Sequence, residues 1–281
     1  MAKVAIVTDS TACIPQELIG LNPVTITPQI LIWGGETLED GVDIEPTAFY
    51  QRLAKASVMP SSSQASPATF EKIFRRLLEQ DHHILAVLIS AKLSGTIASA
   101  ILAKKTIRED APIEVIDSYF TAMAMGYQAL EAAKASTQGA SLAECKAVVE
   151  AARMRCGIYL TVDTLEFLHR GGRIGGASRF LGTALNIKPI LKVEDGKIEA
   201  VERVRTRSKA LQRLLELVET EVGRKPLHIS VLNANAREDA EYLHNQIKSR
   251  MNVVESCLSD LSPVIGANVG PGTVGMAYMT D

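Results

Sequence analysis

The chain has few of the features that would reveal a function directly, beginning with aromatic side chains. It holds one Trp, six Tyr and six Phe, only 5% of its 281 residues. Surfaces that stack nucleic-acid bases need aromatic side chains. A formal net charge of −2 gives no electrostatic attraction for a polyanion or an anionic lipid surface. We therefore expect neither nucleic acid nor an anionic membrane as a partner.

Cysteine pairs and long apolar runs are also missing. The four cysteines lie far apart and form no C-x-x-C pair, which excludes the usual zinc spacings and a thioredoxin-type motif, though not an isolated reactive thiol. We expect no metal. No run approaches the ~18 apolar residues of a membrane span. The apolar stretch near the N-terminus is too short for the core of a signal peptide, so we expect a soluble, cytoplasmic protein.

What the chain does have is a regular alternation of strand and helix patterns. Hydrophobic residues make up 47% of it and charged residues 22%, as in an ordinary globular protein. In the first half, β-rich apolar runs at 3–7, 30–33, 84–89 and 113–116 alternate with helical patterns at 46–56, 67–79, 95–108 and 120–136. A capping box of Ser141 and Glu144 begins another helix that runs to about residue 154. Strands separated by helices predict a parallel sheet covered on both faces.

The second half has a different pattern. Strands at 190–193 and 198–204 flank the turn residues Asp195 and Gly196, which indicate a hairpin. Further helices are predicted at 208–222 and 237–250, with strands at 227–232, 253–257 and 273–278. We therefore predict an α/β fold of two domains: residues 1–156 with a Rossmann-like parallel sheet, and residues 157–281 with a largely antiparallel sheet.

Hydroxyl-bearing residues gather where strands end and helices begin. Such clusters occur at 8–11, 61–66 and 94–96. Ligands of open α/β sheets bind beyond the carboxyl ends of the strands. Hydroxyls and free backbone N–H groups at helix N-termini can form an anion site without a formal cation. Taken singly, each cluster is more typical of helix caps and turns.

Two glycine-rich segments resemble nucleotide-binding motifs but do not fit them. Residues 270–275 match G-x-G-x-x-G, yet only six residues follow, too few for the helix and acidic residue of a dinucleotide site. We interpret this segment as a glycine-rich turn near a ligand. Residues 170–176 lack the G-K-[ST] ending of a P-loop. We therefore expect no nucleotide cofactor.

Six short motifs in chain order carry a more specific signal. They are TDSTAC at 8–13, SSQAS at 62–66, SAKLSGT at 90–96, IDS at 116–118, FLHRGGRI at 167–174 and GANVGPGTVG at 266–275. Together they resemble the DegV family, the fatty-acid-binding proteins that include the FakB subunits of bacterial fatty acid kinase. The resemblance runs from the first predicted strand to the last.

This resemblance implies a fold and a set of ligand-binding residues. A fatty acid would lie between the two domains, with its carboxylate near the strand-end loops and its chain in an apolar tunnel. The family's T-S-Q-P-S and S-G-T motifs imply Ser62 and Ser94 as carboxylate ligands, although Ser62 replaces a threonine and Ala65 a proline. Asn268 stands where the family usually has a histidine. We expect the head-group site to be supported by Ser63, Thr96, Asn268, Asp9 and Ser10.

The function implied is that of a lipid-binding protein, not an enzyme. It would bind a long-chain fatty acid such as palmitate and present the carboxylate to a separate ATP-dependent fatty acid kinase, which makes the acyl phosphate. Arg170 and Arg173 would dock that partner, or else belong to a turn between helices. The alternative is a lipid ester hydrolase or acyltransferase that uses Ser94, although no G-x-S-x-G elbow or neighbouring base is visible. The sequence leaves the preferred chain length and unsaturation open.

Overall fold

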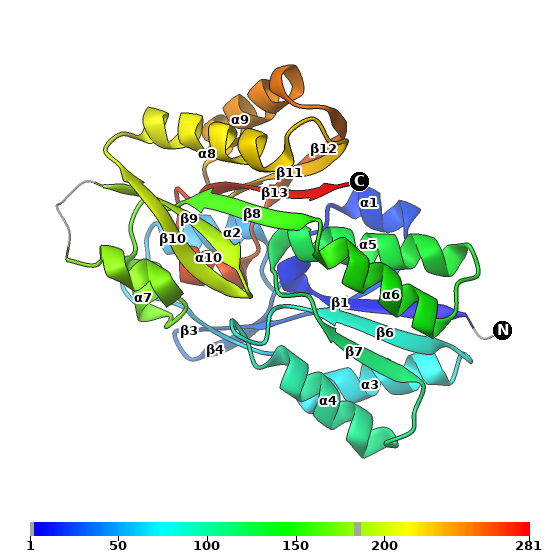
Figure 1. The fold of residues 1–281 in the computed structure, drawn as a ribbon. Coiled ribbons are helices and arrows are strands. Elements are labelled where there is room, and N and C mark those ends of the chain that lie inside the picture. The colour runs from blue at the N-terminus through cyan, green and yellow to red at the C-terminus, as the bar shows by residue number, and fades with distance from the viewer. Residues whose placement is uncertain (1–2, 183–186) are drawn as a thin grey trace.

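The parallel sheet lies at the centre of the first half of the chain. The computed structural model describes residues 3–182 and 187–281. Strands β1 (Val4–Asp9), β2 (Val24–Thr27), β6 (His83–Leu88) and β7 (Ile113–Asp117) form a four-stranded sheet in the order β2-β1-β6-β7, with every pair parallel (Figure 1). Both β1 and β6 are almost wholly buried, as expected for strands covered on both faces. The predicted parallel sheet is confirmed.

Helices cover the two faces of this sheet. On one side lie α3 (Pro67–Leu78) and α4 (Thr96–Ile107), and on the other α5 (Ala122–Thr137) and α6 (Leu142–Arg153) (Figure 1). The capping box of Ser141 and Glu144 begins α6 as predicted. Helix α5 is buried along most of its length because it also packs against the second large sheet. It therefore joins the two halves of the molecule.

A small antiparallel sheet is the main departure from the expected first half. Residues 30–33 do not join the parallel sheet; as β3 (Ile30–Trp33) they pair with β4 (Glu36–Glu39) and β5 (Ser61–Ser63). The reason is the Gly34-Gly35 turn, where both glycines have positive φ and close a β-hairpin. Strand β2 takes the expected place beside β1. Around them lie η1 (Ser10–Ala12), α1 (Gln16–Leu21) and α2 (Pro46–Leu53).

The second half forms a six-stranded sheet. Its order is β10-β9-β8-β13-β11-β12, and only the β11–β12 pair is parallel. The strands are β8 (Cys156–Thr161), β9 (Lys188–Glu194), β10 (Lys197–Val204), β11 (Leu227–Asn233), β12 (Val253–Asp260) and β13 (Val274–Thr280). Helices α8 (Arg207–Val222) and α9 (Arg237–Arg250) cover one face (Figure 1). The predicted largely antiparallel sheet is therefore confirmed.

Three short helical elements complete the second half of the chain. They are α7 (Glu166–Arg170), η2 (Gly175–Phe180) and α10 (Pro263–Val269). The glycine-rich turn expected at 270–275 is present at Pro271 and Gly272, before β13 begins at Val274. No helix was expected at 263–269, where α10 lies. Ser262 caps this helix, Pro263 occupies its first turn, and Gly270 ends it at φ +79°. Across 3–182 and 187–281, no helix combines the length and apolarity needed to cross a membrane.

Candidate functional site

A cavity lies between the loops of the first half and elements of the second. Its empty space is about 580 Å³, part of it continuous with solvent. One part of the lining is polar: Thr11, Gln29, Ser62, Ser63, Gln64, Ser94, Thr121, Arg173 and Asn268. The other part is aliphatic: Ile89, Leu93, Leu168, Ile198, Val264, Ile265 and Val269. The cavity is thus amphipathic, and both halves of the chain build it.

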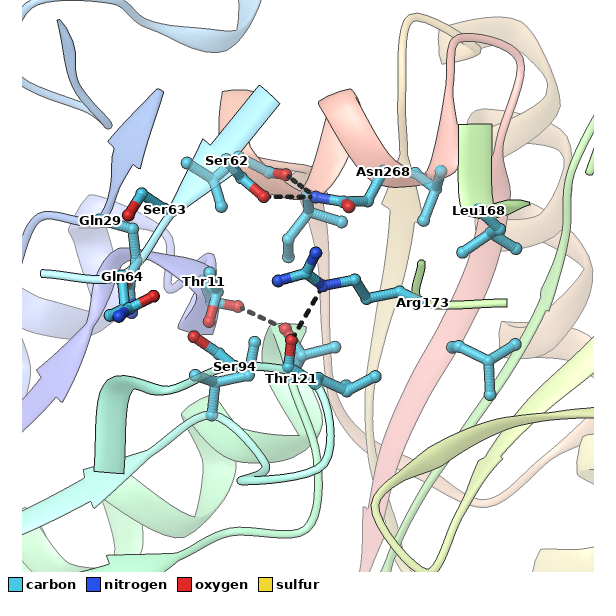
Figure 2. Close-up of a pocket in the computed structure, with 16 residues that line it drawn as sticks. Thr11, Gln29, Ser62, Ser63, Gln64, Ser94, Thr121, Leu168, Arg173 and Asn268 are labelled. Carbon is cyan, nitrogen blue, oxygen red and sulfur yellow. Dashed lines mark hydrogen bonds between the residues drawn. The ribbon is translucent and has the colours of Figure 1, made fainter. Parts of the chain in front are cut away.

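Ser62 and Asn268 form one side of the polar end (Figure 2). Asn268 Nδ2 donates a hydrogen bond to Ser62 Oγ at 2.9 Å and another to the carbonyl oxygen of Val264 at 2.8 Å. Ser62 lies on β5 and Asn268 on α10, so this contact joins the two halves of the molecule. Ser63 lines the same cavity. Asn268 therefore holds the Ser62 hydroxyl in place.

Ser94 lies across the cavity, immediately before α4. Its hydroxyl shares a hydrogen bond with Thr96 Oγ1 at 2.8 Å. Thr96 is fully buried and does not line the cavity; it also accepts a hydrogen bond from Gln29 Nε2 at 2.8 Å. Gln29 Oε1 in turn accepts the backbone N–H of Ala65 at 2.9 Å. Thr96 and Gln29 thus fix Ser94 relative to the loop that follows Ser62 and Ser63.

Asp9 and Ser10 lie behind the cavity wall and not on it. Asp9 is fully buried and accepts hydrogen bonds from the backbone N–H groups of Thr11 and Ile89, both of which line the cavity. Burial raises the pKa of Asp9, and the hydrogen bond from the Thr11 hydroxyl opposes that rise. Ser10 instead donates to Asp40 Oδ2 at 2.7 Å, on the far side of the loop.

Arg173 lines the cavity, in contrast to Arg170. Its Nε donates to the carbonyl oxygen of Leu93 at 3.1 Å, and Figure 2 shows the guanidinium between the Ser62 side and the Ser94 side. The expectation of an anion site without a formal cation is therefore wrong. Arg170 is exposed and forms an ion pair with Glu166. Of the two arginines, only Arg170 is placed at the surface.

Sequence reasoning missed Gln29, Thr121 and the position of Arg173. Thr121 Oγ1 donates to the carbonyl oxygen of Thr11 at 3.3 Å, so it braces the loop after β1 (Figure 2). A single polar residue between Pro28 and an apolar strand was the available signal for Gln29. No local pattern places Arg173, because its side chain reaches the cavity where the segment after α7 meets Leu93 of the first half.

The tip of the β9–β10 hairpin rests on the loop that leads to Ser94. Ser90 Oγ donates to the carbonyl oxygen of Gly196 at 2.9 Å, and Lys92 Nζ donates to that of Asp195 at 2.7 Å. Gly196 has φ +77°, and a Cβ added there would lie 2.3 Å from Ser90 Oγ. The hairpin therefore approaches this loop as closely as a glycine allows, next to Ile198 of the cavity wall.

The chemistry of the lining suits an anion with an apolar tail. Among the described lining residues there is no carboxylate, imidazole, thiol or amine, and Arg173 is the only ionisable one. Ser94 therefore has no general base in the described wall to activate it. Hydroxyls, amides and a guanidinium can donate hydrogen bonds to a carboxylate. The residues that the structure describes also contain no group of three or more His, Cys, Asp or Glu suited to a metal ion.

Comparison with known proteins identifies the family. A family model described as "Uncharacterised protein, DegV family" matches residues 3–281. A DegV domain-containing protein of Clostridium perfringens is 36% identical, covering 99% of this chain and 99% of its own. A fatty-acid-binding DegV family structure from Thermus thermophilus superposes with a TM-score of 0.93 at 34% identity, covering 99% of this chain and 100% of its own. A stearic-acid-binding protein from Eubacterium ventriosum has a TM-score of 0.90 at 25% identity, covering 100% of this chain and 98% of its own. The chain belongs to the DegV family.

Proposed function

We propose that this protein binds a long-chain fatty acid, with the carboxylate between Ser62, Ser94 and Arg173. The observation that carries the proposal is one cavity whose wall combines hydroxyl, amide and guanidinium groups with aliphatic side chains. The fatty acids bound by the Thermus and Eubacterium relatives support the same ligand class. Arg173 supplies the positive charge for the carboxylate, and the two serines supply directional hydrogen bonds.

The tail supplies most of the binding free energy. Each buried methylene contributes about 0.8 kcal/mol, so about fourteen of them contribute about 11 kcal/mol before other terms. Ordering of the chain and loss of translational freedom offset much of this gain. The head-group contacts then need only to orient the carboxylate and replace its hydration. An amphipathic cavity with a single cation meets both needs.

We further infer that the protein presents the bound carboxylate to a separate ATP-dependent fatty acid kinase. The polar end of the cavity supports this inference because Gln64 and Gly95, beside the serines, are exposed. A partner could therefore approach the carboxylate while the tail stays between the sheets. Arg170, exposed near the same end, is our candidate for the docking contact.

The first experiment is mass spectrometry of lipid extracted from the purified protein, with Ser57→Ala as the matched control for Ser94→Ala. Ser57 is an exposed serine that does not line the cavity. We expect a long-chain fatty acid in near-stoichiometric amount from the wild type and from Ser57→Ala, and a reduced amount from Ser94→Ala. Equal loading of all three proteins, or no fatty acid in any of them, would contradict the proposed binding site.

The second experiment separates presentation from catalysis. The fatty-acid-loaded protein is incubated with radiolabelled ATP, with and without a purified bacterial fatty acid kinase. We expect acyl phosphate only when the kinase is present. The same preparation is then incubated with p-nitrophenyl esters, where we expect no saturable turnover. Turnover that depends on Ser94 would support the hydrolase alternative in place of this proposal.

A further inference from the structure

A second cavity lies on the opposite side of the loop that follows β1. Its empty space is about 1120 Å³, part of it continuous with solvent. The loop at 10–17, the turn at 40–42 and the segment at 258–263 all contribute to its wall. Ser10 marks the boundary with the fatty-acid cavity, because its hydroxyl also accepts the backbone N–H of Gln29 at 3.1 Å. The two cavities are therefore neighbours that share no lining residue.

Asp40 in the wall of this second cavity has an unpaired oxygen. The side chain is buried, with only 2% of the residue exposed. Oδ2 accepts the Ser10 hydroxyl at 2.7 Å, and the Ser262 hydroxyl and the Val264 N–H lie close enough to favour the charged carboxylate. Oδ1 is nevertheless buried and accepts no hydrogen bond of normal geometry. A buried polar atom left unpaired costs free energy, so native structures nearly always pair such atoms. The unpaired oxygen points to a missing hydrogen-bond donor.

The surroundings of Asp40 specify the charge of that donor. Among the described residues that line the cavity there is no Lys, Arg or His, and the other carboxylates are Glu17 and Asp260, both exposed. Cys13 is uncharged at neutral pH, since burial raises the pKa of its thiol to about 12. An unpaired carboxylate oxygen among acidic groups is complementary to a cation.

The rest of the wall specifies the form of the cation. Prolines and aliphatic side chains, including Ile14, Ile26 and Leu258, alternate with the acidic and hydroxyl groups. No set of three or more acidic, His or Cys side chains among the described residues is arranged to hold a metal ion. An ammonium group carries three N–H donors, and a short alkyl chain attached to it would contact the apolar wall. This combination favours an organic cation over an inorganic one.

We propose that this second cavity binds a primary aliphatic ammonium group, which donates a hydrogen bond to Asp40 Oδ1. The site is distinct from the fatty-acid cavity and does not depend on the proposed fatty acid function. Asp260 contributes charge at the entrance, where its Oδ1 already accepts Asn233 Nδ2 at 2.7 Å.

The test is an NMR titration of the protein with butylammonium chloride at neutral pH, in an amine-free buffer. We expect saturable shifts of the backbone amides of Gly41 and Val42, which lie in the cavity wall. Two probes serve as controls: 1-butanol has the same chain without charge, and tetramethylammonium has charge without an N–H donor. Both should bind at least tenfold more weakly. Equal affinity for either control, or shifts centred on Ser62 and Ser94, would overturn the proposal.

Variants of the acidic residues add a second readout. Asp40→Asn should weaken butylammonium binding at least tenfold, because a hydrogen bond to a charged group is lost. Asp260→Asn, on an exposed side chain, should weaken it severalfold even if the Asp40 variant fails to fold. Asp110→Asn, an exposed carboxylate outside the cavity, is the matched control and should bind like the wild type. Wild-type affinity in folded Asp40→Asn, or in Asp260→Asn, would refute the assigned site.

Discussion

At the scale of single residues, the Ser94 hydroxyl has the most direct consequence for ligand binding. Ser94→Ala removes one hydrogen bond to a carboxylate, which contributes about 1.5–3 kcal/mol. We expect the affinity for fatty acid to fall roughly tenfold to more than a hundredfold. Displacement of a fluorescent fatty acid measures the change. Ser62→Ala should act in the same direction but less, because the adjacent Ser63 also lines the cavity.

Circular dichroism and thermal unfolding of both serine variants serve as the control for folding. Ser94 and Ser62 are partly exposed, and their loss leaves no large void, so both proteins should unfold close to the wild-type temperature. Unchanged dissociation constants in two folded variants would mean that the carboxylate binds elsewhere.

Arg173 allows a sharper test, since Arg170 lies three residues away on the surface. Arg173→Ala removes the only described cation of the cavity wall, so fatty acid affinity should fall by roughly tenfold or more. The fatty acid affinity of Arg173→Lys should lie between those of the wild type and Arg173→Ala, because lysine keeps the charge but lacks the planar guanidinium. Arg170→Ala should leave fatty acid affinity unchanged and slow acyl-phosphate formation by the kinase. Equal affinities for Arg173→Ala and Arg170→Ala would remove Arg173 from the binding site.

The uncharged side chain of Asn268 leads to a prediction about how fatty acid binding depends on pH. Its amide donates to Ser62 and never becomes charged, so wild-type affinity should change little with pH beyond the titration of the ligand itself. In Asn268→His, a neighbouring carboxylate would favour the protonated imidazole, and binding should be tighter near pH 5.5 than near pH 8. Comparing both proteins at each pH removes the contribution of the ligand. Identical pH profiles would show that position 268 does not sense the ligand's charge.

At the scale of elements, local patterns predict a helix or strand well when its signals lie within it. The capping box fixes the start of α6, and Asp195-Gly196 fixes the β9–β10 turn. Short elements whose partners are distant in sequence were missed or misplaced. Strand β5 consists of three serines and pairs only because β3 lies beside it, so neither its composition nor its periodicity reveals a strand.

The β9–β10 hairpin provides a prediction about ligand exchange. Gly196→Ala puts a side chain on a residue with positive φ, which strains the backbone. The added Cβ would also clash with Ser90 Oγ, so we expect the hairpin tip to move away and the hydrogen bond from Ser90 to break. We expect faster fatty acid dissociation in a stopped-flow displacement assay. Gly139→Ala is the matched control: φ there is +91°, but nothing lies within 4 Å of an added Cβ.

Both substitutions place alanine at a residue with positive φ and therefore strain the backbone, so both variants should unfold at a lower temperature than the wild type. Only Gly196→Ala should change the dissociation rate. If Gly139→Ala accelerates dissociation as much, or if neither variant does, the hairpin tip does not limit release of the ligand.

At the scale of the whole molecule, the candidate site comes from segments that meet only after the two sheets pack. The motifs at 62–66 and 90–96 could be assigned from sequence because a family resemblance supplied their meaning. The contact of Asn268 with Ser62 spans 206 residues, and the place of Arg173 depends on its hydrogen bond to Leu93 of the first half. Helix α10 was not predicted, so local patterns gave no basis for placing Asn268 beside Ser62.

Asp40 links the stability of the whole molecule to pH. Burial raises its pKa from 3.8 to about 6 in the folded protein, while the donors at Ser10, Ser262 and Val264 oppose that rise. The folded state therefore holds a proton that the unfolded state has lost in this pH window, so Asp40 lowers stability as pH rises through it. At about 1.4 kcal/mol per pH unit, the loss amounts to about 3 kcal/mol.

Asp40→Asn isolates this contribution because the variant cannot titrate at that position. Ser141 lowers the pKa of Glu144, but that group is present in both proteins and cancels in the difference. Asp9 repels the charge of Asp40, so the difference measures Asp40 together with this coupling. Urea unfolding from pH 4 to pH 7 in amine-free buffer measures that difference. We expect the free energy of unfolding of the wild type to fall relative to the variant as pH rises from about 4 to about 6. A difference that stays constant with pH would show that Asp40 has the same pKa in both states.

Adding butylammonium near pH 7 should then restore part of the wild-type stability and none of the variant's, because a cation that pairs with the charged carboxylate binds only the folded state.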